Sequence, residues 1–75
     1  MSTQSDIEIL CKNIRFLRHK HSLSQEEMSQ LLGVELHSLQ LLEQDILPDD
    51  IYVDFLWDLS DLFDLSPAQL FKPLW

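Results

Sequence analysis

Residues 24–44 read SQEEMSQLLGVELHSLQLLEQ, and this stretch decides the fold. Ser24 can accept a hydrogen bond from the backbone N–H three residues on, while Glu27 can reach back to the Ser24 N–H, which forms a helix-starting capping box. Gly33 supplies the left-handed residue that ends this helix. A further helix is expected from about Leu36 to Gln44. The stretch therefore predicts two short helices joined by a tight turn, which matches the helix-turn-helix unit.

Apolar residues at helical spacing predict three more helices and no strand. These helices are expected from about Asp6 to Lys20, from about residue 50 to 64, and from about residue 67 to 72. Asp49 or Asp50 follows the helix breaker Pro48 as the cap of the fourth helix, and Ser66-Pro67 opens the fifth. The sequence therefore predicts one all-α domain over residues 1–75, with the two-helix unit at about 24–44.

The charge of the chain is strongly acidic. Thirteen acidic residues stand against five lysines and arginines, which gives a formal net charge of -8. Between Lys20 and Lys72 there is no lysine or arginine at all. Such a balance favours solubility and weakens non-specific attraction to phosphate. A chain of 75 residues is also short enough that self-association often contributes to its stability.

Several classes of protein and site are disfavoured by the sequence. Cys11 is the only cysteine, so no intramolecular disulfide forms, and a small buried residue is its expected role. The start lacks the pattern of a signal peptide, and no stretch approaches the roughly 20 apolar residues of a membrane span. We therefore expect a cytoplasmic protein that does not contact membranes.

No catalytic or metal site is predicted either. The three histidines His19, His21 and His37 lack the spacing and the converging carboxylates of a metal site, so we expect them to be exposed. Asp54, Asp58 and Asp61 line one face of the expected fourth helix, with no nucleophile or phosphate loop nearby. A solvated acidic face that can attract a basic partner is the better interpretation. We expect no enzyme activity and no cofactor.

Six short motifs lie along the chain in a characteristic order: Leu17-Arg18, Leu23-Ser24-Gln25-Glu26-Glu27-Met28, Leu31-Leu32-Gly33-Val34, Ser38-Leu39, Leu42-Glu43 and Ser66-Pro67-Ala68-Gln69-Leu70-Phe71. Their order and spacing resemble the Cro/C1 (XRE) family of helix-turn-helix transcriptional regulators, over roughly Asn13 to Phe71. The resemblance implies a compact five-helix, lambda-repressor-like domain that binds double-stranded DNA. Its third helix would enter the major groove, and its second would lie across the backbone.

The resemblance also implies roles for individual residues. Arg18 and Glu43 match an internal ion pair that ties the first helix to the third. Gln25 matches a phosphate contact, with an ordinary first-turn residue as the alternative. The base-facing positions correspond to Leu36, His37, Ser38, Gln40 and Leu41. The other candidates for phosphate contacts are Lys12, Arg15, Lys20 and Gln44.

The departures from the family pattern fall on the surface that would face DNA. Glu35 stands at a cap position that is usually serine or threonine, and Asp45 replaces a common glycine. The loop from Ile46 to Asp50 is longer than usual and carries Asp49 and Asp50 where basic residues often contact phosphate. Good DNA binders neutralise roughly six to ten phosphates, which this chain cannot match alone. We therefore expect weak or dimer-dependent binding.

Two functional hypotheses follow from these patterns. The first is a sequence-specific regulator that binds operator DNA as a homodimer. The second is an acidic helix-turn-helix module that docks on a basic protein partner instead of DNA. The aromatic group near the end of the chain, with Tyr52 and Phe71 among its members, bears on self-association. Trp57, Leu74 and Trp75 would either complete the core or form a dimer interface.

Overall fold

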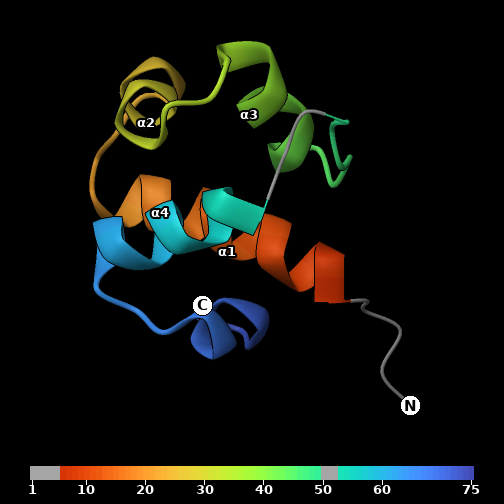
Figure 1. The fold of residues 1–75 in the computed structure, drawn as a ribbon, viewed down its shortest axis with the longest axis vertical. Helices are drawn as coiled ribbons and strands as arrows, with labels where there is room; N and C mark the ends of the chain where they lie inside the picture. Colours follow the sequence, from red (N-terminus) through yellow and green to blue (C-terminus); the bar gives the residue numbers. More distant parts are fainter. Residues whose placement is uncertain (1–5, 50–52) are drawn as a thin grey trace.

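The computed structural model describes residues 6–49 and 53–75, without the side chain of Val53. The elements are α1 (Asp6–Lys20), α2 (Gln25–Leu32), α3 (Leu36–Glu43), α4 (Val53–Phe63) and the 3₁₀ helix η1 (Pro67–Phe71). Figure 1 shows these helices gathered into one globule, with no strand in the part of the chain that it describes. The prediction of an all-α fold is therefore confirmed over these residues.

The helix boundaries depart from the expected ones mainly near the C-terminus. The last element is a 3₁₀ helix, not a fifth α-helix, because it has only five residues before the chain reaches Pro73. The described part of α4 begins at Val53, and the expected start near residue 50 lies outside the described residues. Of the two expected caps, Asp49 lies in a turn before this helix, and Asp50 lies outside the described residues.

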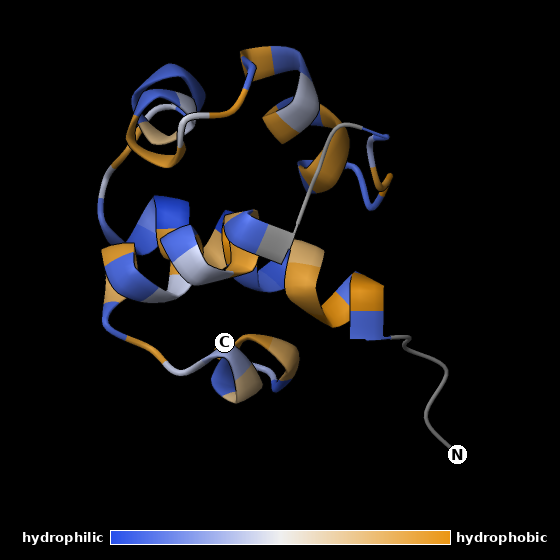
Figure 2. Cartoon of the chain, viewed as in Figure 1, coloured by the Kyte–Doolittle hydropathy of each residue, from blue (hydrophilic) through white to orange (hydrophobic). Residues whose placement is uncertain are grey.

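The core lies where the inner faces of all five elements meet. α1 packs against α3 and η1, α2 packs against α3 and α4, and α4 packs against η1. Figure 2 shows that each helix carries both hydrophobic and hydrophilic residues along its length. The buried apolar side chains are Leu10, Cys11, Ile14, Leu17, Met28, Leu32, Leu39, Leu42, Phe55, Leu59 and Leu70. Burial of these side chains is the main favourable contribution to folding.

A polar contact attaches the C-terminal segment to α1. Asn13 is fully buried, and its side-chain Nδ2 donates to the carbonyl oxygens of Leu70 at 2.7 Å and Lys72 at 2.8 Å. Its Oδ1 accepts from the backbone N–H of Leu74 at 3.0 Å. One amide therefore satisfies three backbone groups that would otherwise lose water without replacement.

The four α-helices end in the same way. At each end, one residue adopts a left-handed backbone conformation, namely Ser22, Gly33, Asp45 and Asp64, with φ between 54° and 68°. The residue after it donates to a carbonyl in the last turn, as in Val34 N–H to Ser29 O at 3.0 Å. Only one of the four residues is the glycine that this conformation favours.

The length and hydropathy of the helices bear on membrane insertion. Among the helices over residues 6–49 and 53–75, none combines the length and apolar character that a membrane crossing requires.

Candidate nucleic-acid interface

α2 and α3 are joined by a turn that begins at Gly33. The N-cap Ser24 Oγ accepts from the Glu27 N–H at 3.0 Å, and the Glu27 carboxylate accepts from the Ser24 N–H at 2.9 Å. These hydrogen bonds from Ser24 hold the pKa of Glu27 below its ordinary value. Gly33 adopts φ of 68° as the C-cap. The capping box and the terminating glycine expected from the sequence are therefore confirmed.

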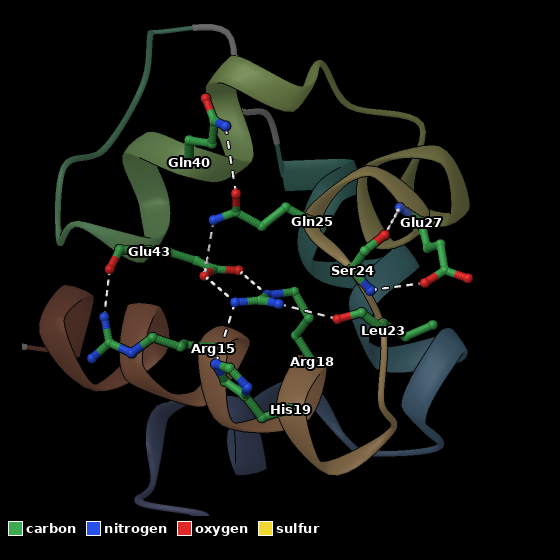
Figure 3. Close-up of polar contacts among 9 residues, drawn as sticks. All are labelled: Arg15, Arg18, His19, Leu23, Ser24, Gln25, Glu27, Gln40 and Glu43. Atoms are coloured by element: carbon green, nitrogen blue, oxygen red, sulfur yellow. Dashed lines mark hydrogen bonds and ion pairs between the residues drawn. The ribbon is translucent and has the colours of Figure 1, made fainter.

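A bidentate ion pair fixes α3 against α1. Arg18 Nε donates to Glu43 Oε2 at 2.6 Å and Arg18 Nη2 donates to Oε1 at 2.9 Å, so the expected pair is present (Figure 3). Arg18 Nη1 also donates to the carbonyl of Leu23 at 3.0 Å, just before α2 begins. Both side chains are largely withdrawn from solvent, with 13% and 6% of their side-chain surfaces exposed. The guanidinium thereby joins the end of α1, the start of α2 and the end of α3.

Two glutamines expected at DNA extend this network. Gln25 Nε2 donates to Glu43 Oε1 at 3.2 Å, and Gln40 Nε2 donates to Gln25 Oε1 at 3.4 Å (Figure 3). Both side chains are half-buried between α2 and α3. The resemblance suggested separate roles for them, at a phosphate and at a base. In the structure they form a single chain of amides that ends on the buried carboxylate.

The remaining base-facing candidates differ in exposure. His37 is exposed, while Leu36 and Leu41 are half-buried. Ser38 is 3% exposed and belongs to the buried face of α3. Gln44, a candidate phosphate contact, is exposed at the C-cap of α3. The outward face of α3 therefore presents His37 and Gln44 as its fully exposed polar candidates, with Leu41 between them.

The candidate cations all belong to α1, and each also contacts the protein. The Nζ atoms of Lys12 and Lys20 lie 5.7 Å and 5.9 Å from the ring centroids of Trp75 and Phe16. Arg15 Nη1 donates to the backbone carbonyl of Glu43 at the end of α3. These aromatic and backbone contacts leave the positive charges in place, since none neutralises them. The positive potential of the molecule is thus gathered along one helix.

A shallow groove runs between α3 and the loop after it. Leu41, Ile46, Leu47 and Pro48 supply its apolar lining, and Glu35, His37, Ser38 and Asp49 complete it. Ile46 is 47% exposed and Leu47 is 52% exposed. Glu35 is the N-cap residue of α3, but its side chain makes no capping hydrogen bond. We call this feature the α3 groove; its lining includes the two acidic residues Glu35 and Asp49.

Comparison with protein-family models, curated proteins and solved structures finds no match for this chain.

Histidine and cysteine positions give no sign of metal chemistry. His19, His21 and His37 are exposed, as expected, and the His21 ring packs 4.9 Å from the Phe63 ring. Cys11 is fully buried, also as expected. Among residues 6–49 and 53–75, no group of three or more histidine, cysteine or acidic side chains could hold a metal ion.

The candidate self-association residues lie on different parts of the surface. Trp57, on α4, is 57% exposed, and Trp75 is 52% exposed beside α1. Leu74 is half-buried and packs against the core. The suggestion that Trp57 completes the core is therefore wrong: the face of α4 that packs inward presents Phe55 and Leu59 instead. Tyr52 lies outside the described residues.

Proposed function

We propose that this chain is a sequence-specific DNA-binding transcriptional regulator with a Cro/C1-type helix-turn-helix formed by α2 and α3. The observation that carries the proposal is the bidentate Arg18–Glu43 pair, which holds α3 on α1 while His37 and Gln44 stay exposed. A recognition helix needs this combination of a rigid support and an accessible outer face. In this proposal α3 enters the major groove and α2 lies across the DNA backbone.

The expected contacts divide into base and phosphate contacts. His37 offers hydrogen bonds to base edges, and Leu36 and Leu41 offer apolar contact to a thymine methyl. Gln25 and Gln40 would approach DNA as a linked pair, because Gln40 already donates to Gln25. Lys12, Arg15, Lys20 and Gln44 are the proposed phosphate contacts. With so few cations, the affinity at physiological salt is modest.

Selection from a random-sequence duplex library at about 50 mM salt tests the proposal. The fluorescence anisotropy of the selected, labelled duplex then gives the affinity at about 50 mM and about 200 mM salt. We expect an enriched sequence whose affinity falls steeply over this range. Lys12→Gln should reduce the slope of log affinity against log salt by about one, whereas the matched control Lys72→Gln should leave it unchanged. A folded protein that enriches no sequence at the lower salt would refute DNA binding.

The α3 groove favours a second candidate function, an acidic helix-turn-helix module that docks on a basic protein partner. The exposed Ile46 and Leu47 line this groove together with the acidic residues Glu35 and Asp49. A lining that combines apolar side chains with carboxylates complements a cationic amphipathic helix, which can bury leucines and pair its lysines. The same surface is poorly suited to phosphate, because its charges are negative.

A designed cationic amphipathic peptide and its scrambled isomer separate this candidate from the first. We expect the amphipathic peptide to bind and Leu47→Gln to weaken its binding. Leu31→Gln is the matched control, since Leu31 is 56% exposed on α2, away from the groove. Equal binding of both peptides, or an equal loss of peptide affinity in Leu47→Gln and Leu31→Gln, would show that the α3 groove is not a specific binding site.

A further inference from the structure

Two helix faces carry opposite charge at the same spacing: the face on α1 is half-buried except at its last residue, and the face on α4 is exposed. On α1 the face consists of Lys12, Arg15, Phe16 and His19, and on α4 it consists of Asp54, Trp57, Asp58 and Asp61. Both sets follow the i, i+3, i+4, i+7 pattern, which places their members on one side of a helix. We call them the cationic stripe and the acidic stripe. Each contains one aromatic residue, at the third and the second position respectively.

The cationic stripe borders a hollow on the surface. Lys12, Arg15, Phe16 and His19 line it together with Trp75, whose ring lies 5.7 Å from the Lys12 Nζ. The hollow is mostly apolar between these cationic groups, and Trp75 is half exposed at its edge. It therefore suits a partner surface that brings carboxylates and an aromatic ring together.

The acidic stripe has this composition. Asp54, Asp58 and Asp61 are all exposed, and Trp57 between them is 57% exposed. An exposed tryptophan surrounded by carboxylates is costly to leave in water and is enriched at the centres of interfaces. The stripe lies on the outer side of α4, because Phe55 and Leu59 occupy its buried side.

The two stripes match when their helices run antiparallel. The polar members of the α1 stripe are separated by three and then four residues, and those of the α4 stripe by four and then three. Reversal of one helix thus aligns Lys12 with Asp61, Arg15 with Asp58, and His19 with Asp54. The same register places Phe16 opposite Trp57. Because both helices rise by about 1.5 Å per residue, the match holds over two turns.

We propose that the cationic stripe of one molecule binds the acidic stripe of a second copy of this chain. The stripes cannot pair within one molecule, since α1 and α4 both turn their inner faces to the same core. Figure 1 shows α4 in front of α1, and Phe55 and Leu59 occupy the buried side of α4, so its acidic stripe faces away from α1. Contact between copies is therefore head-to-tail, with a free stripe at each end of a pair.

This contact gives Trp57 and Trp75 a shared role in self-association. Trp57 forms the centre of one stripe, and Trp75 borders the other. At physiological salt, the Debye length of about 8 Å screens the repulsion between distant charges of two acidic copies but leaves pairs in contact largely effective. The proposal does not depend on DNA binding, because the contact and its test involve only this chain.

Charge reversal at the aligned pair Lys12 and Asp61 tests the proposal by sedimentation at about 150 mM salt. The mass-average molecular weight of the wild-type chain should rise as its concentration rises. Lys12→Glu alone and Asp61→Lys alone should each associate at least about tenfold more weakly, because like charges then face each other. An equimolar mixture of the two variants should recover association, since every contact between unlike copies pairs opposite charges.

Matched controls place the same charge changes elsewhere on the surface. Lys72→Glu and Asp49→Lys alter exposed residues outside both stripes and should associate like the wild type. Circular dichroism of each variant confirms that it is folded. A wild-type chain that stays monomeric at millimolar concentration would overturn the proposal. So would single variants that associate normally, or a mixture that associates no better than its components.

Tryptophan fluorescence provides a second readout of the register. Trp75→Phe leaves Trp57 as the single tryptophan of the chain, opposite Phe16 in the proposed contact. Its emission should shift to shorter wavelength as the concentration rises, and addition of Lys12→Glu to this variant should abolish the shift. Association without any change at Trp57 would show that another surface is used.

Discussion

Asn13 illustrates how much one side chain can contribute in a small domain. It connects α1 to backbone groups that are 57 to 61 positions away in the sequence. Nothing in the local pattern marks it, because an asparagine inside an amphipathic helix usually faces solvent. Here it faces the core, and the C-terminal segment closes over it. Its contribution to stability arises only when the C-terminal segment is packed against α1.

Replacement of Asn13 by alanine should therefore be strongly destabilising. The variant leaves two carbonyl oxygens and one N–H without their partner, at a cost of about 2–4 kcal/mol in the free energy of unfolding. Urea denaturation measures the loss of stability, and Trp75 emission in a Trp57→Phe background reports whether the C-terminal segment loosens first. Gln30→Ala, at an exposed position on α2, is the control and should change stability by less than about 0.5 kcal/mol.

Asp45 ends α3 in a left-handed conformation with φ of 63°, at the position where relatives of the proposed family commonly carry glycine. We expect Asp45→Gly to stabilise the chain by about 1 kcal/mol, because glycine adopts this conformation without steric cost. Asp45→Ala removes the same charge but keeps the steric cost. Thermal unfolding of both variants separates the steric effect from the charge effect. If Asp45→Ala gains as much stability as Asp45→Gly, the gain is due to loss of the charge.

Gln25 and Gln40 form hydrogen bonds within the molecule that the sequence pattern did not indicate. The resemblance assigned each a contact with DNA, but both amides lie within hydrogen-bonding distance of neighbours in the same molecule. Glutamine is long and carries both donors and an acceptor, so its partner is decided by what lies nearby. A sequence does not contain that information directly. The proposed DNA contacts of these two residues remain predictions.

At the scale of elements, the two helices of the proposed reading unit differ in how they begin. α2 has a complete capping box, whereas α3 begins at Glu35 with no side-chain capping hydrogen bond. The hydroxyl-capped start of α2 was readable from Ser24 and Glu27 alone, because capping is local. At the start of α3, the Glu35 carboxylate does not form the capping hydrogen bond that a hydroxyl would form. Glu35 also adds negative charge beside the α3 groove.

Glu35→Ser should repair this helix start. We expect a gain of about 1 kcal/mol in the free energy of unfolding, because serine can accept from the free N–H groups of the first turn. Glu35→Gln is the comparison variant, since it removes the charge without adding a good cap and should not be stabilised. If the proposed DNA binding holds, both variants should bind duplex more tightly. Equal stability of the two variants would contradict the capping argument.

At the scale of the whole molecule, charge is strongly segregated. Four of the five lysines and arginines lie in α1, and the acidic residues dominate the other helices. This arrangement limits the phosphate contacts of a single copy and creates the two complementary stripes. The cationic residues proposed for phosphate contact also belong to the stripe proposed for self-association. DNA and a second copy would therefore compete for Lys12 and Arg15.

Cys11 reports on the integrity of the whole core. Burial, followed by the nearby Asp45 carboxylate, raises the pKa of Cys11 to about 11, from an ordinary value of 9.0. The unfolded chain thus loses this proton at lower pH than the folded chain. The stabilising effect is complete below pH 9.0 and is lost as the pH rises toward about 11. Unfolding measured from pH 8 to 11 should therefore show a smaller decline for Cys11→Ala than for the wild type. Parallel declines in the stability of the two proteins would contradict a contribution from Cys11.

The sequence alone determined the order of the helices, most of their boundaries, the capping box at Ser24, the terminating Gly33 and the Arg18–Glu43 pair. The helix features follow from hydrogen bonds and apolar spacing within a few residues, so the local sequence contains them. The pair was expected from the family resemblance. The 3₁₀ form of η1 was missed, because apolar spacing over five residues does not distinguish it from an α-turn.

Only the tertiary structure decided which polar side chains meet and which faces stay open. The Asn13 contacts, the Gln40–Gln25–Glu43 chain and the outward position of Trp57 all depend on how α1, α3, α4 and η1 pack together. Such contacts join residues that are distant in sequence, so local propensity cannot specify them. The two stripes share this origin: their spacing is present in the sequence, but the packing around one core leaves the α4 stripe exposed and the α1 stripe half-buried.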